Sequence, residues 1–122
     1  MSFQAMIHTD CYTINFVDSK HEKLISPEDA RIHWGITRFD EKGIYIRDDL
    51  KVGETKKILI HELVHAFADS YGFGQVEWTE EIVADFLEQY FNEINAIIKN
   101  YEVYIATKHE NPETTAQIYF GE

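Results

Sequence analysis

The sequence predicts a single α+β domain over residues 1–122, in which a small antiparallel sheet of about three strands packs on two helices. Apolar and polar residues alternate over short stretches of the first half, as they do in half-buried strands. In the second half, apolar residues recur every three or four positions, as in amphipathic helices. Hydrophobic residues make up 44% of the chain, which is enough for one modest core. We expect that core to span about residues 12–106, with residues 107–122 as a loose tail.

The expected strands lie in the first half of the chain. Alternating apolar residues predict them at residues 12–17, 31–39 and 43–47. The turn between the last two ends in Gly43, which we expect to have a positive φ. The polar stretch before them contains Pro27, so it is expected to be a loop.

Two helices are expected in the second half. The first runs from about Glu54 to Ser70, where apolar residues keep helical spacing and no Gly or Pro interrupts them. The second begins after Thr79, a good N-cap, and continues to near Thr107. Its long apolar stripe is typical of core packing or of a dimer seam. The oligomeric state does not follow from the sequence.

Charge and composition exclude several classes of partner. The net charge is −11, from 11 basic and 22 acidic residues, so nucleic-acid phosphates and anionic membranes would repel the chain. It has no run of about 18 apolar residues and no signal-peptide pattern at its start, so neither a membrane span nor export is expected. The single cysteine, Cys11, has no internal disulfide partner and is expected to be a buried or half-buried thiol in a cytoplasmic protein.

The most informative motif is His61-Glu62-Leu63-Val64-His65, an H-E-x-x-H pattern on the first expected helix. Two histidines four positions apart lie one helical turn apart on the same face, so both imidazoles can reach one metal ion. The glutamate between them can take a proton from a metal-bound water. The motif therefore predicts a catalytic zinc site with Glu62 as its base.

A catalytic zinc usually has three protein ligands, so a third one is required. Asp69 is excluded because it lies about 12 Å along the helix from His61. The metzincin pattern is excluded as well, because it needs other residues at positions 68 and 71. The remaining candidates are Glu77, Glu80 and Glu81, which follow the glycine-containing turn. Glu81 is favoured because Asp85, one turn later, could accept a hydrogen bond from a metal-bound histidine.

Together, His61-Glu62-Leu63-Val64-His65 and Glu81-Ile82-Val83-Ala84-Asp85-Phe86 resemble the gluzincin metallopeptidases, and most of all the small ImmA/IrrE-like proteins and the phage-type minigluzincins. The resemblance covers roughly residues 31 to 95. It implies a zincin-like fold and a zinc-dependent metallopeptidase that acts on a peptide or protein substrate. It also implies that the ligands are His61, His65 and Glu81, that Glu62 is the general base and that Asp85 supports the site.

The chain also departs from the family pattern. Gluzincins usually supply a Tyr or His that stabilises the oxyanion, and no motif identifies that residue here. The candidates are Tyr71, Tyr90, Tyr101 and His109, and His33 could also face the cleft. This gap leaves a second hypothesis, a catalytically silent zinc-binding protein of phage or regulatory origin whose acidic surface binds a basic protein.

Overall fold

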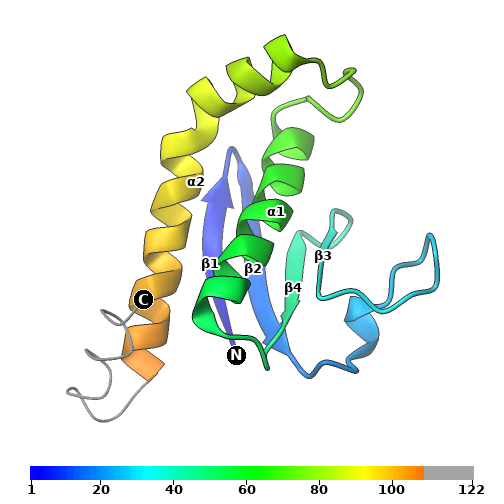
Figure 1. Cartoon of the computed structure of the whole chain (residues 1–122), viewed down its shortest axis with the longest axis vertical. Coiled ribbons are helices and arrows are strands. Elements are labelled where there is room, and N and C mark those ends of the chain that lie inside the picture. The colour runs from blue at the N-terminus through cyan, green and yellow to red at the C-terminus, as the bar shows by residue number, and fades with distance from the viewer. Residues whose placement is uncertain (109–122) are drawn as a thin grey trace.

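The computed structural model describes residues 1–108 of the chain, and the fold is α+β (Figure 1). One sheet carries two helices, and a 3₁₀ turn, η1, lies in the loop after the second strand. The elements are β1 (Ser2–Ile7), β2 (Asp10–Val17), η1 (Glu22–Leu24), β3 (Gly35–Arg38), β4 (Gly43–Arg47), α1 (Val52–Ser70) and α2 (Glu80–Lys108). In Figure 1, α1 lies over one face of the sheet and α2 runs beside α1.

The sheet has four strands in the order β1-β2-β4-β3, which corrects the expectation of three antiparallel ones. β1 and β2 are antiparallel, as are β3 and β4, whereas β2 and β4 are parallel. β1 is hard to predict from the sequence, because exposed Met6 obscures its alternation and because His8, rather than a glycine, takes the positive φ of 58° at the turn. The sheet therefore begins at residue 2 rather than near residue 12.

β3 is shorter than the predicted strand at 31–39. Before Gly35, Ile32 makes only an isolated bridge to Ile25, and the Trp34 ring is 53% exposed under the Arg47 guanidinium, 5.2 Å away. The expectation for Gly43 is also wrong, because Lys42 takes the positive φ, at 54°. A side chain at Gly43 would instead approach the ring of Tyr45 to 3.0 Å.

The core fills the space between the helices and one face of the sheet. Tyr12, Ile14 and Phe16 of β2 are buried there, as the alternation predicts. Leu59, Leu63 and Phe67 of α1 are fully buried against them. On α2, the predicted stripe is only partly covered: the buried members are Phe86, Tyr90, Ile94, Ile97, Ile98 and Tyr101.

The helix boundaries agree closely with the sequence. α1 begins two residues before Glu54, and α2 ends one residue after Thr107. The hydroxyl of Thr79 accepts a hydrogen bond from the backbone N–H of Ile82 at 3.3 Å, so it caps α2 as expected. The expectation for Cys11 is wrong, because its side chain is exposed.

Within residues 1–108, no helix is both long enough and apolar enough to cross a membrane. The predicted tail lies, from residue 109 onward, outside the described residues.

Candidate metal and catalytic site

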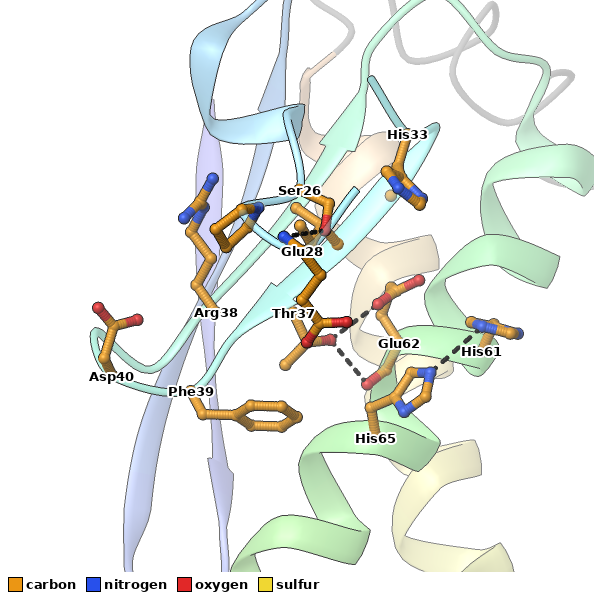
Figure 2. Close-up of a pocket in the computed structure, with 13 residues that line it drawn as sticks. Ser26, Glu28, His33, Thr37, Arg38, Phe39, Asp40, His61, Glu62 and His65 are labelled. Carbon is orange, nitrogen blue, oxygen red and sulfur yellow. Dashed lines mark hydrogen bonds between the residues drawn. The ribbon is translucent and has the colours of Figure 1, made fainter. Parts of the chain in front are cut away.

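His61 and His65 lie side by side at the middle of α1, with both rings exposed (Figure 2). Their Nε2 atoms are 3.3 Å apart. Two nitrogen ligands at about 2.0–2.1 Å from one tetrahedral zinc ion are separated by roughly 3.3–3.4 Å. The histidine pair therefore has the spacing of two ligands of a single tetrahedral ion, which fits the metal that the motif predicts.

Glu62 faces the same cleft but is only 6% exposed. The hydroxyl of Thr37 on β3 lies 2.9 Å from Oε1 of Glu62 and 3.1 Å from its backbone oxygen. A hydroxyl that can donate to the carboxylate fixes its position and leaves its other lone pairs available. Thr37 thus orients the proposed base, although no sequence motif marks this residue.

The cleft has a volume of about 620 Å³ and lies between α1 and the β3 segment. β3 is an edge strand, because its only neighbour in the sheet is β4. The Trp34 carbonyl accepts from the Arg47 N–H, and bonded pairs alternate along an antiparallel ladder. The backbone groups of Gly35 and Thr37 consequently point away from β4, along the open edge where an extended peptide can add as a further strand.

Gly35 permits the close approach of β3 to α1. A Cβ at this position would lie 2.5 Å from Cγ2 of Ile58 and 3.4 Å from Cγ of Glu62. A contact of 2.5 Å is far inside van der Waals distance, so any side chain would push β3 away from the helix. The strand, its hydroxyl at Thr37 and the carboxylate of Glu62 are therefore positioned together by the absence of a side chain.

We expect Gly35→Ala to lower the free energy of unfolding by about 1–3 kcal/mol, the usual range for overpacking a core contact. Urea unfolding followed by circular dichroism measures the change. Gly74→Ala is the matched control, because no atom lies within 4 Å of a Cβ built at Gly74. Equal unfolding midpoints for the two variants would contradict the packing argument.

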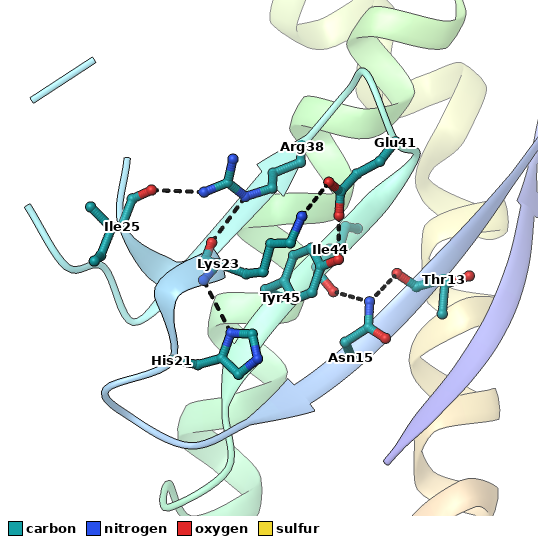
Figure 3. A network of polar contacts seen from close by, with 9 residues as sticks. All are labelled: Thr13, Asn15, His21, Lys23, Ile25, Arg38, Glu41, Ile44 and Tyr45. Atoms are coloured by element: carbon teal, nitrogen blue, oxygen red, sulfur yellow. Dashed lines mark hydrogen bonds and ion pairs between the residues drawn. The ribbon is translucent and has the colours of Figure 1, made fainter. Parts of the chain in front are cut away.

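The loop at residues 23–28 forms the outer wall of the cleft. A polar network holds this loop against the β3–β4 hairpin (Figure 3). The Arg38 guanidinium donates to the backbone oxygens of Lys23 and Ile25, at 3.1 and 2.8 Å. Lys23 Nζ lies 2.8 Å from Glu41, which also accepts from the Tyr45 hydroxyl. Burial and this hydrogen bond raise the pKa of Tyr45 to about 12, so its hydroxyl remains a donor at neutral pH.

The bonds from Lys23 and Tyr45 hold the pKa of Glu41 below its usual value. A carboxylate with a lowered folded-state pKa stabilises the fold above its unfolded pKa, and this stabilisation is lost as the pH falls through the folded value. We therefore expect wild type to lose more stability than Glu41→Gln between pH 6 and pH 3, in thermal melts at fixed ionic strength. Parallel losses in the two proteins would count against the network.

His33 lines the same cleft and is held by Asp29. Its Nε2 lies 3.1 Å from Oδ2 of Asp29, with both side chains partly exposed. The backbone N–H of Arg31 and the His33 ring lower the pKa of Asp29, so this carboxylate is ionised at neutral pH. The Asp29 contact, four residues before His33, fixes the orientation of the imidazole. Of the oxyanion candidates within residues 1–108, His33 is the one that lines this cleft.

The three tyrosine candidates lie elsewhere. Tyr90 and Tyr101 are 8% and 5% exposed in the core. Tyr71 stacks on Tyr90 with ring centroids 4.4 Å apart and reaches Glu93 on α2. His109, the remaining candidate, lies outside the described residues.

Glu81 and Asp85 are exposed on the first turns of α2 and are not brought to the histidine pair. Within residues 1–108, no group of three or more His, Cys, Asp or Glu side chains is arranged to hold a metal ion. Tyr90 packs on Phe67 near the end of α1, and Glu81 lies nine residues earlier in an antiparallel helix. α2 runs antiparallel to α1 (Figure 1), so Glu81 lies about 13.5 Å beyond Tyr90 along the α2 axis, on the side away from the motif.

No family model, curated protein or solved structure matches this chain.

Proposed function

We propose that this protein is a zinc-dependent metallopeptidase of the small gluzincin type, with a zincin-like fold, that acts in the cytoplasm on a peptide or protein substrate. One observation supports it above all. The two imidazoles have the spacing of ligands on one tetrahedral ion, and the carboxylate of Glu62 faces the same cleft. A structural site needs no base beside its ligands, whereas a hydrolytic site does.

His61 and His65 are the residues that would hold the zinc ion. When bound, the ion supplies a coordinated water of lowered pKa and polarises a carbonyl. The family resemblance makes Glu81 the third ligand and Asp85 its support. For Glu81 to reach the ion, the first turn of α2 has to move toward the motif.

The chain's own residues account for the remaining steps. Glu62 takes the proton from the attacking water and delivers it to the leaving amine, while Thr37 keeps its carboxylate in place. The open edge of β3 holds the substrate in extended form through the backbone groups of Gly35 and Thr37. The imidazole of His33, fixed by Asp29, is the candidate donor to the charge that develops on the carbonyl oxygen.

The test is peptide hydrolysis by the purified full-length chain, measured on a mixed peptide library by mass spectrometry. We expect cleavage that a chelator stops and that stoichiometric zinc restores. Cleavage that continues in the chelator, or a chain that binds no zinc, would refute the proposal.

The second candidate is a silent zinc-binding protein whose acidic surface binds a basic protein. Residues 80–98 contain five carboxylates and no Lys or Arg. On the same stretch, Val83, Leu87 and Phe91 are 41%, 49% and 58% exposed, which leaves an apolar stripe uncovered on α2. Stoichiometric zinc without turnover of any library peptide would favour this candidate.

A further inference from the structure

A second cavity adjoins the motif cleft and shares Phe39 and His65 with it. Its volume is about 420 Å³, within the range of cavities that bind small ligands. In Figure 2, Phe39 and His65 lie at the same end of the motif cleft, so the cavity continues from that end. A substrate bound beside His65 would thus meet this cavity with one of its side chains.

The walls of this cavity are mainly apolar. Val64 and Ala68 of α1 line it, together with the aromatic side chains of Phe39 and Trp78. The Phe39 and Trp78 rings are 41% and 42% exposed, so both have apolar surface that a ligand can cover. The Trp78 ring packs on Phe86 of α2, with ring centroids 5.4 Å apart, so Trp78 and the start of α2 form one wall.

The polar residues at the cavity give little preference for a charged ligand. Among the described residues, the ionisable groups that line it are His65 and Asp69. The Asp69 carboxylate lies 3.9 Å from Nζ of Lys42, so a cation is already beside it. A cationic side chain would have to compete with Lys42, whereas an apolar one gains by covering the two aromatic rings.

We propose that this cavity binds a large aliphatic or aromatic side chain of the substrate, next to the bond that is cut, and so sets the substrate class. The assignment to a cleaved substrate rests on the proposed function. The binding of an apolar side chain does not, because it depends on Val64, Ala68, Phe39 and Trp78 rather than on zinc or Glu62.

Trp78 allows binding to be measured without catalysis. In a Trp34→Phe background it is the only tryptophan of the chain. The probes are N-acetyl-leucine amide, N-acetyl-alanine amide and N-acetyl-arginine amide, titrated against Trp78 fluorescence in metal-free protein. We expect saturable binding of the leucine probe, about tenfold tighter than that of the alanine probe, since each added buried methylene favours binding. Equal affinities, or tightest binding of the arginine probe, would overturn the proposal.

Filling the cavity provides the second arm. Ala68→Leu should lower the affinity for the leucine probe by about tenfold or more, because the new side chain fills the space in the cavity that the probe would occupy. Val64→Phe gives the same expectation at a half-buried position, should the first variant unfold in a thermal melt. Val83→Phe, at an exposed position on α2, is the matched control. Unchanged affinity in a folded cavity variant would place the binding elsewhere, whereas leucine binding in a chain without peptidase activity would refute only the proposed function.

Discussion

Glu62→Gln is expected to reduce peptide hydrolysis by about 10²–10⁴-fold, the usual contribution of a general base. The amide keeps the shape of the side chain and can still pair with the Thr37 hydroxyl, but it cannot take a proton from water at neutral pH. Zinc content should stay at the wild-type level, because the two histidines are unchanged. The measurement combines initial rates on the best library peptide with zinc analysis of the same preparation.

Glu88→Gln is the matched control for this prediction, because it removes the same charge at an exposed position of α2. Its rate should equal that of wild type. A Glu62→Gln protein with full activity and full zinc would remove Glu62 from the chemistry. Loss of zinc together with activity would instead show that Glu62 acts through the metal site.

The motif helix could be predicted from the sequence because its signals are local. The apolar residues of α1 recur at a helical period, and a spacing of four positions brings His61 and His65 together on any α-helix. Neither inference depends on how the helix packs. The N-cap at Thr79 followed in the same way, from a residue type with a local hydrogen bond to make.

The parts that could not be predicted depend on contacts between distant segments. The parallel pairing of β2 with β4 leaves no local trace, and β1 is joined to β2 through an unmarked turn at His8. Gly35 and Thr37 matter only because β3 packs against α1, 23 to 25 residues further along the chain. In the sequence, Gly35 and Thr37 offer only a weak signal: a glycine between apolar residues, with a hydroxyl side chain two positions later.

The position of Glu81, the proposed third ligand, is where sequence and structure differ most. The sequence pattern at Glu81 and Asp85 predicts an approach to the motif, while aromatic packing of Tyr90 on Phe67 and Tyr71 sets α2 further along. Spacing within one helix cannot specify the register between two helices, because side-chain packing decides it. The proposed zinc site therefore requires metal binding to move α2 from the arrangement that the structure shows.

His65→Ala should abolish stoichiometric zinc binding, with zinc affinity lower by at least about 100-fold, since it removes one of the two proposed histidine ligands. If α2 closes onto the metal, Glu81→Gln should lower the zinc affinity by about 10- to 100-fold. This loss is in the range seen when a group that supports a metal site is removed. Titration against a competing chelator measures both. Glu80→Gln is the control, as its neighbour in the same turn.

Closure of α2 has a signature independent of affinity. Spin labels attached at Lys57→Cys on α1 and Ala84→Cys on α2, in a Cys11→Ser background, report the distance between the two helices. We expect zinc to shorten that distance in the otherwise wild-type protein and to leave it unchanged in Glu81→Gln, because only the carboxylate links α2 to the ion. If Glu81→Gln changes neither the label distance in the presence of zinc nor the zinc affinity, the histidine pair holds the ion without α2. In that case the resemblance to the gluzincins does not extend to Glu81, the residue that distinguishes them from other proteins with an H-E-x-x-H helix.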